Sequence, residues 1–271
     1  MEGVVNEAGV TKERLEILRK IEEYEKLGLF DKDVENDPEA PELLPNKVDY
    51  LCEKFSSKLL RKIANFTADR FFQGLIKKGV LIIDGVEGKE HLTALAQGAV
   101  ITCNHFSPMD NYIVFECIRD KLPKKYLYKV IREGNYTNFP GLYGFFFRHC
   151  NTLPLSSNKR TMISFATAVN TLLKNGESIL IYPEQAMWWN YRKPRPFKVG
   201  AFKMAHRAGV PVVPMFITMQ NDTALLDKDG YPAQRHTLHI LPPIYPDVSP
   251  AEMRDKAFAL CQEKYNEVYL P

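Results

Sequence analysis

Apolar residues recur at helical spacing in the first part of the chain. In residues 11–27 they alternate with charged residues, which predicts a surface helix. The apolar positions of this helix are Leu15, Leu18, Ile21 and Leu27. Residues 31–46 are acidic and contain Pro38, Pro41 and Pro45, so we expect a linker or an irregular loop there.

A second helical region, over residues 48–78, has an apolar face with a basic flank beside it. The apolar face consists of Cys52, Phe55, Leu59, Ile63 and Phe66. The basic flank consists of Lys54, Lys58, Arg61 and Lys62. Two interpretations are open: a helix that covers one side of a core with its lysines in water, or an interfacial helix that lies on an anionic membrane.

Beyond residue 80, short apolar runs typical of strands alternate with helical segments. Strands are expected at 80–83, 98–103, 126–131, 152–155, 178–182, 212–219 and 238–241, and helices at 108–119, 161–174, 201–208 and 250–265. This alternation predicts an α/β fold, with a mixed, largely parallel sheet flanked by helices and preceded by an N-terminal helical region. We divide the chain into an acidic N-terminal helix and linker (1–46), an amphipathic basic helical region (47–79) and an α/β domain (80–271).

Charge is distributed unevenly along the 271 residues. Residues 1–50 carry 7 basic and 14 acidic side chains, residues 51–160 carry 17 and 9, and residues 161–271 carry 12 and 10, which gives the net charge of +3. The basic excess in the middle of the chain predicts an anionic partner, which is a lipid headgroup, a phosphorylated substrate or an acidic carrier protein. Because no nucleic-acid-binding module is recognisable, nucleic acid is not expected as a partner.

Other features limit the class of protein further. No apolar run reaches the ~20 residues that span a bilayer, and the charged N-terminus lacks the apolar segment of a cleavable signal peptide. The five cysteines contain no CxxC pair and are odd in number, which favours reduced intracellular thiols over a disulfide framework or a zinc site. We therefore expect a cytoplasmic protein without a metal.

Residues 104–110 read Asn-His-Phe-Ser-Pro-Met-Asp and connect a buried strand to a helix. Ser107, Pro108 and Asp110 suit a helix start of the S-x-x-D capping type, which by itself would explain them. However, His105 stands at the carboxyl end of a strand, where open α/β sheets bind ligands. Asp110, in the first helical turn, can reach back to the imidazole and orient it as a general base for a hydroxyl. A capping role and a catalytic role are both compatible with these residues.

Three further blocks follow this His-x4-Asp pair. They are Gly144–Arg148 with Thr152–Leu155, then Ile181–Glu184, then Val210–Pro214, and the segment Pro196–Phe202 reads P-F-K-V-G-A-F. In this order the blocks resemble those of the glycerolipid acyltransferase superfamily, whose best known members are the lysophosphatidic acid acyltransferases. The resemblance covers roughly residues 80–220.

The resemblance implies transfer of a fatty acyl group from a thioester of coenzyme A or acyl carrier protein to a lipid hydroxyl. His105 would be the general base and Asp110 the residue that orients it, and neither a metal nor a redox cofactor is implied. The expected acceptor is a lysophospholipid, with 1-acyl-glycerol-3-phosphate first. The candidate substrate-binding residues are Glu184, Lys198, Gly200, Arg148, Lys159 and Arg160. Pro214 and Gly200 are equally compatible with structural roles.

Two blocks depart from the family pattern. The third block usually reads F-P-E-G-T-R, but here Glu184 is followed by Gln185, Ala186 and Met187, and Ser157 stands where the second block usually ends in arginine. Two positions that would present guanidinium groups to a phosphate therefore lack them. Either nearby basic residues supply the charge or the acceptor is not a phosphomonoester. The candidates for the missing charge are Lys159, Arg160, Arg192, Lys193, Arg195 and Lys198.

Several alternatives accompany this interpretation. A hydrolase using the same histidine would need a nucleophile, but no G-x-S-x-G motif is present and Cys103 is expected to face the core. A catalytically silent, lipid-binding member of the family is the non-enzymatic alternative. The resemblance also favours membrane contact for residues 51–78, with the protein peripheral on the inner face of the membrane. The apolar runs Leu142–Phe147 and Trp188–Trp189 belong either to that surface or to the interior.

Overall fold

The computed structural model describes residues 9–35 and 40–270. Pro38 of the expected linker lies outside the described residues. The α-helices are α1 (Lys12–Leu27), α2 (Phe55–Lys77), α3 (Asp110–Ile118), α4 (Glu133–Thr137), α5 (Gly141–His149), α6 (Lys159–Lys174), α7 (Gly200–Ala208) and α8 (Pro250–Tyr269). Short 3-10 helices are η2 (Pro45–Lys47), η3 (Lys89–Gln97) and η4 (Arg119–Lys121).

The described strands form one seven-stranded sheet in the order β1-β7-β6-β2-β5-β3-β4. The strands are β1 (Ile82–Glu87), β2 (Ala99–Thr102), β3 (Leu127–Ile131), β4 (Thr152–Pro154), β5 (Ser178–Ile181), β6 (Val212–Leu226) and β7 (Pro232–Ile240). Neighbouring strands are parallel except for the antiparallel pair β6–β7. The mixed, largely parallel sheet predicted from the sequence is therefore confirmed.

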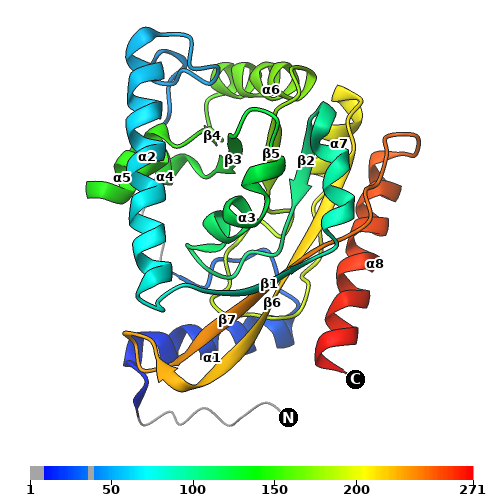
Figure 1. The fold of residues 1–271 in the computed structure, drawn as a ribbon. Helices are drawn as coiled ribbons and strands as arrows, with labels where there is room; N and C mark the ends of the chain where they lie inside the picture. The colour runs from blue at the N-terminus through cyan, green and yellow to red at the C-terminus, as the bar shows by residue number, and fades with distance from the viewer. Residues whose placement is uncertain (1–8, 36–39, 271) are drawn as a thin grey trace.

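Helices cover both faces of the sheet (Figure 1). One apolar core joins the sheet to α6, α7 and α8, through residues such as Phe165, Phe202 and Met253. A second core joins it to α3 and η3, through residues such as Ile113, Val114 and Leu95. Because the central strands are buried on both faces, they are short and almost continuously apolar, as parallel strands are.

The structure differs from the predicted elements at the β1 side of the sheet. The first strand begins at Ile82 and continues to Glu87, and the predicted strands 212–219 and 238–241 are parts of the long β6–β7 hairpin. The outer half of this hairpin is polar and extends beyond the core, so it lacks the apolar pattern of a buried strand. The hairpin turn contacts the start of α1, where Asp229 accepts hydrogen bonds from the Thr11 amide and the Arg14 side chain.

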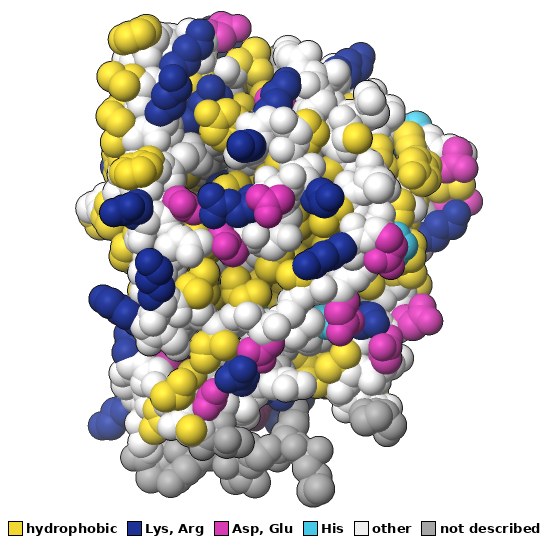
Figure 2. All heavy atoms as spheres, viewed as in Figure 1, with side chains coloured by type: hydrophobic (Ala, Val, Ile, Leu, Met, Phe, Trp, Pro, Cys, Tyr) yellow, Lys and Arg dark blue, Asp and Glu magenta, His cyan; other side chains and the backbone are white. Residues whose placement is uncertain are grey.

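Helix α2 presents its predicted apolar row to solvent. Phe55, Leu59, Ile63 and Phe66 are between 46% and 83% exposed, whereas the opposite side packs through Ala64, with Ala68 and Phe71, against α5. Cys52 does not belong to this row, because it lies before the helix in a left-handed conformation and is buried. The interpretation of the row as a core-facing surface is wrong. Figure 2 shows hydrophobic side chains along this edge of the molecule with lysine and arginine side chains beside them.

In the part of the chain that the structure describes, no helix combines the length and the apolar character needed to cross a bilayer.

Candidate active site

The histidine–aspartate pair lies where β2 ends and α3 begins. His105 Nδ1 is 2.7 Å from Asp110 Oδ2, the Asp110 side chain is fully buried, and the His105 side chain is 20% exposed. Because the carboxylate accepts the proton on Nδ1, Nε2 carries the free lone pair of a neutral imidazole. The partly exposed ring can therefore take a proton from a bound hydroxyl at Nε2.

Four donors converge on the Asp110 carboxylate. Besides the imidazole, Oδ2 accepts hydrogen bonds from the amides of Phe106 and Ser107, each at 3.3 Å, and Oδ1 accepts one from the Tyr182 hydroxyl at 2.7 Å. The expected capping box forms only in part, since Ser107 Oγ accepts from the Met109 amide rather than from that of Asp110. Asp110 thus both closes the loop and orients the histidine, and the two interpretations of its role are compatible.

Asn104 anchors the loop to the sheet. Its side-chain amide bonds both main-chain groups of Ile217 in β6, with Nδ2 donating to the carbonyl at 3.0 Å and Oδ1 accepting from the amide at 2.8 Å. The loop therefore leaves β2 in a defined direction, and the position of the histidine next to Asn104 is set by the sheet.

Tyr182 forms one side of the histidine site. Residue Thr102 of β2 pairs with Ile181 of β5, so the residues that follow these strands lie side by side. The Tyr182 ring stacks on the imidazole with a centroid distance of 4.0 Å and an interplanar angle of 13°. Burial raises the pKa of the Tyr182 hydroxyl far above its usual value, so the group remains a donor to Asp110. The sequence placed Tyr182 in the third block but did not predict this contact, because it depends on strand register.

A buried ion pair holds the backbone of His105. Glu184 Oε2 is 2.8 Å from the Arg195 guanidinium, and the two side chains are 2% and 1% exposed. The same carboxylate accepts hydrogen bonds from the amides of His105 (3.2 Å) and Arg195 (2.9 Å). Arg195 in turn donates to the carbonyl of His105 at 3.3 Å and to that of Ala186. The Glu184 side chain is therefore buried inside the protein, where it holds the backbone of His105.

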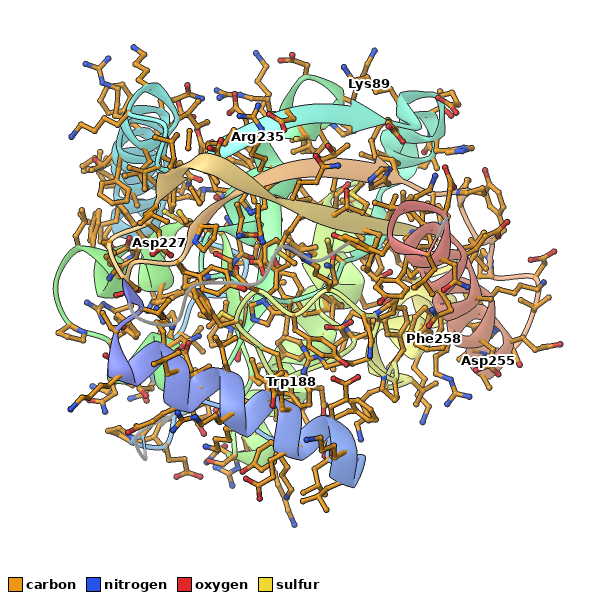
Figure 3. All side chains as sticks on the ribbon, turned by 90° about the horizontal axis from the view of Figure 1, so that it is seen from below. Lys89, Trp188, Asp227, Arg235, Asp255 and Phe258 are labelled. Atoms are coloured by element: carbon orange, nitrogen blue, oxygen red, sulfur yellow. The ribbon has the colours of Figure 1, made fainter. Side chains whose placement is uncertain are left out.

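The N-terminal segment covers the loop that carries this ion pair. Trp188 Nε1 donates to the Lys32 carbonyl at 2.8 Å, the Trp188 ring stacks on Phe30, and Arg195 donates to the Phe30 carbonyl at 3.1 Å. Figure 3 shows Trp188 against α1. Trp188 and Trp189 are buried in an apolar cluster with Ile17 and Ile21. The suggestion that the two tryptophans belong to a membrane surface is wrong, and the alternative of interior packing is correct.

Most of the basic residues considered for phosphate binding have partners within the protein. Lys198 pairs with Asp31 at 3.1 Å and Lys193 with Glu25 at 2.6 Å. Arg192 donates to Asn221, and Arg195 belongs to the buried ion pair described above. Lys159 and Arg160 are exposed at the start of α6, which is capped by Asn158.

Glu133 occupies the space beside Ser156 and Ser157, where the family pattern has an arginine. Its carboxylate accepts hydrogen bonds from the Ser156 hydroxyl at 2.8 Å and from the Ser157 amide at 3.1 Å. The departure from the family pattern is thus structural as well as chemical, because a carboxylate holds this turn.

The remaining candidate residues lie farther from the His105–Asp110 pair, which is called the dyad below, or within the helices and strands of the fold. Arg148, on α5, donates to the carbonyls of Phe139 and Tyr136 and lines a separate cavity at the base of α2. Gly200 begins α7, and a Cβ added there would meet no atom within 4 Å. Pro214 pairs with Thr102 inside the sheet. These placements agree with structural roles for Gly200 and Pro214.

Cys103 faces the core, as expected. The residue is 1% exposed, and burial raises the pKa of its thiol well above the usual value. A thiol kept protonated in this way is a poor nucleophile.

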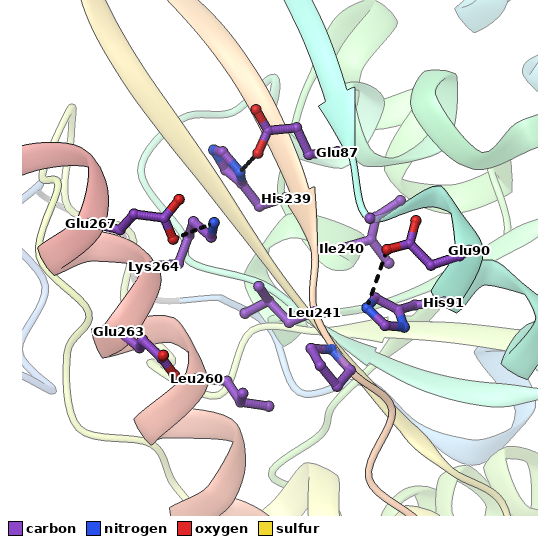
Figure 4. A pocket seen from close by; sticks show the side chains of 12 residues that line it. Glu87, Glu90, His91, His239, Ile240, Leu241, Leu260, Glu263, Lys264 and Glu267 are labelled. Atoms are coloured by element: carbon purple, nitrogen blue, oxygen red, sulfur yellow. Dashed lines mark hydrogen bonds and ion pairs between the residues drawn. The ribbon is translucent and has the colours of Figure 1, made fainter.

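Among the residues that the structure describes, no group of three or more histidine, cysteine, aspartate or glutamate side chains is placed to hold a metal ion. A cavity of about 350 Å³ lies between β7, η3 and α8 (Figure 4), but its acidic residues mostly face basic partners, with Glu87 on His239 and Glu267 on Lys264. That cavity does not contain the dyad.

Together, the fold and the site define an α/β enzyme with a carboxylate-oriented histidine at the carboxyl end of a parallel sheet. Residues 85–218 match the family model described as Acyltransferase. This part of the chain is an acyltransferase domain, and the protein is an enzyme of the acyltransferase type.

A similar fold is seen in the crystal structure of the 1-acyl-sn-glycerophosphate (LPA) acyltransferase PlsC from Thermotoga maritima. The TM-score is 0.53 and the sequence identity 21%, over 79% of this chain and 80% of that chain. Comparison with curated protein sequences finds no match.

Proposed function

We propose that the protein transfers a fatty acyl group from an acyl thioester to the hydroxyl of a lysophospholipid-type acceptor at a membrane surface. The donor is a thioester of coenzyme A or acyl carrier protein, and 1-acyl-glycerol-3-phosphate is the first acceptor to test. The observation that carries this proposal is the His105–Asp110 pair at 2.7 Å in an acyltransferase domain. The match in fold to PlsC, described as an LPA acyltransferase, supports the choice of acceptor.

In the proposed reaction, Nε2 of His105 removes the proton of the acceptor hydroxyl as its oxygen attacks the thioester carbonyl. The carbon–sulfur bond then breaks, and the imidazolium returns the proton to the leaving thiolate. Asp110 stabilises the transient positive charge on the ring. No acyl-enzyme is required, because both substrates are bound together and the thioester is already activated.

The acceptor could also lack a phosphomonoester, and a specific observation favours this second candidate. Asp31 and Glu25 pair with Lys198 and Lys193, and Glu133 holds the turn at Ser157. Two of the candidate lysines are therefore already neutralised, and a carboxylate holds the turn at Ser157, so less positive charge remains for a dianionic phosphate. Lys159 and Arg160 remain as candidates to bind a phosphate.

Membrane contact is proposed for the exposed row of α2. Four large apolar side chains face solvent there, with Lys54, Lys58 and Lys62 exposed beside them. Apolar side chains favour the acyl boundary of a bilayer and lysines favour anionic headgroups. From the α5 region, Leu142 and Tyr143 are also exposed, whereas Phe146 packs inside. The expected location is thus peripheral, on the inner face of the membrane.

The test of the proposed function is an acceptor screen that follows thiol release from acyl-coenzyme A and from acyl carrier protein. Lysophosphatidic acid, a zwitterionic lysolipid and a neutral monoacylglycerol are compared at matched concentration. We expect thiol release only with an acceptor, its loss in His105→Ala, and no loss in His206→Ala, which removes an exposed histidine of α7. Release without acceptor would indicate a hydrolase, and no release with any acceptor would favour a lipid-binding role. Preference for the neutral acceptor, unchanged in Lys159→Gln/Arg160→Gln, would replace the phosphate-bearing acceptor by the second candidate.

A further inference from the structure

A second cavity lies at the N-terminal end of α2, apart from the dyad. Its volume is about 250 Å³, and it is enclosed by the segment 46–54, the first turns of α2, the start of β3 and the α5–β4 connection. Neither His105 nor Asp110 lines it, and the acyl-transfer chemistry proposed above makes no use of it.

The side chains around this cavity carry an excess of positive charge. Lys47, Lys54, Arg61 and Arg148 line it, with Asp49 as the acidic residue. The Asp49 carboxylate is occupied by the amides of Glu53 and Lys54, at 3.0 and 3.1 Å. None of the four basic side chains forms an ion pair with a described residue, in contrast to the lysines near Glu184.

The two arginines of the cavity are held by neutral groups. Arg61 donates to the Tyr128 hydroxyl at 3.2 Å and lies 4.8 Å from the centre of the Tyr126 ring. Arg148 donates to the Phe139 carbonyl at 3.2 Å. These contacts fix the guanidinium groups in place but leave their positive charges uncompensated.

Two donor atoms of residues that line this cavity have no acceptor. Arg61 Nε and Asn151 Nδ2 are buried without a hydrogen-bond partner among the described residues. Asn151 is 5% exposed, and its amide group lies near the Tyr128 hydroxyl without making a hydrogen bond of good geometry. The uncompensated cations around the cavity favour a ligand that is anionic and rich in hydrogen-bond acceptors.

The position of the cavity indicates where such a ligand comes from. Lys54, Ser56 and Ser57 line it, and Phe55 between them is 83% exposed and begins the apolar row of α2. A lipid with its phosphate in the cavity would have its acyl chains next to that row. We propose that this cavity binds the phosphate of an anionic phospholipid headgroup and so fixes α2 on the membrane, an inference that rests on the proposed membrane contact of α2.

The experiment measures vesicle binding by the full-length protein. Phosphatidylcholine vesicles carry either phosphatidic acid or cholesteryl hemisuccinate, an anion without phosphate, at matched surface charge. The cavity variant is Lys47→Gln/Lys54→Gln/Arg61→Gln. The control is Arg70→Gln/Lys77→Gln/Lys78→Gln, which removes the same charge from the other half of the helix region. Because Arg61 is partly buried, the variant Lys47→Gln/Lys54→Gln, with both lysines exposed, tests the same site without disturbing the Tyr128 contact.

We expect the parent protein to bind phosphatidic acid vesicles about tenfold more tightly than hemisuccinate vesicles, as charge-assisted hydrogen bonds to phosphate would give. Both cavity variants should lose most of this preference, and the control variant should lose affinity for both vesicles equally. If the cavity variants and the control variant kept the same preference for phosphatidic acid over hemisuccinate vesicles, the inference would be overturned. Full competition by inorganic phosphate or coenzyme A at the lipid concentration would also overturn it, because the site would then be one for a soluble phosphate.

The outcome is independent of catalysis, since His105→Ala should bind both vesicles as the parent does. A parent protein that transfers acyl groups but shows no preference for phosphatidic acid removes this site and leaves the proposed reaction standing. A parent protein that prefers phosphatidic acid vesicles but transfers no acyl group supports this site and removes the proposed reaction.

Discussion

Replacing Glu184 by glutamine tests the buried ion pair behind the loop that carries His105. Glu184 accepts three hydrogen bonds, from the amides of His105 and Arg195 and from the Arg195 guanidinium. Glutamine has nearly the same shape, but it directs an NH2 group at donors and removes the charge that compensates Arg195. Since Arg195 is 1% exposed, its guanidinium would remain buried without a counter-charge.

The expected magnitude follows from this burial. Removing one partner of a buried ion pair costs about 3–5 kcal/mol of unfolding free energy. For a chain of this size the melting temperature should fall by about 10 °C. The matched control is Lys198→Gln. Lys198 is on the same loop as Glu184, and its replacement breaks the exposed ion pair with Asp31 of the N-terminal segment. Both partners of that pair are about half exposed, so the loss should stay below about 1 kcal/mol.

Activity should respond as well, because the His105 amide and carbonyl are both held by this pair. A shift of the histidine by about 1 Å would cost about 10²-fold in turnover. The assays are urea unfolding and single-turnover thiol release for the variant, for Lys198→Gln and for Glu184→Gln/Arg195→Met. The double variant should recover much of the stability, since it removes the uncompensated charge, but not the activity. If Glu184→Gln melted within a degree of the parent and kept its turnover, the assignment of Glu184 as a positioning residue would be refuted.

Further outcomes are expected for the dyad, for alkaline pH and for α2. His105→Ala should fold normally and lose about 10²–10⁴-fold in turnover. Asp110→Asn should lose most activity while α3 still forms, because asparagine also suits helix starts. Unchanged turnover in either variant would contradict the general-base role. Burial raises the pKa of the Cys103 thiol above its unfolded value of 9.0, so its contribution to stability is complete below about pH 9 and is lost as the pH rises toward the folded pKa. Urea unfolding above pH 9 should therefore show a slope shallower by about 1.4 kcal/mol per pH unit in Cys103→Ala than in the parent, and parallel slopes would contradict the assigned burial of the thiol. Phe55→Ser/Leu59→Ser should leave the melting temperature unchanged, because both side chains are exposed, and should weaken sedimentation with anionic vesicles; a large drop in melting temperature would instead indicate a packing role.

The sequence by itself was sufficient to predict the α/β architecture and the His105–Asp110 pair. Buried parallel strands are short and apolar, and the helices between them have clear periodicity, so their alternation was sufficient to predict the sheet. His105 and Asp110 are five residues apart across one strand–helix turn, and local geometry alone brings such residues together. The helices α4 and α5 were not predicted, because α4 is short and the aromatic run Leu142–Phe147 does not show which side is buried.

Only the tertiary structure decided the surroundings of the dyad. Tyr182 contacts Asp110 because β5 is in register with β2. Arg195 pairs with Glu184 through an irregular loop, whose conformation cannot be predicted from a periodic sequence pattern. The acidic N-terminal segment neutralises Lys193 and Lys198, which lie more than 160 residues away along the chain. The apolar row of α2 is exposed although its pattern equally suits a core-facing helix. Helical spacing shows that residues share a face, but only packing against the rest of the chain determines whether that face meets protein or solvent.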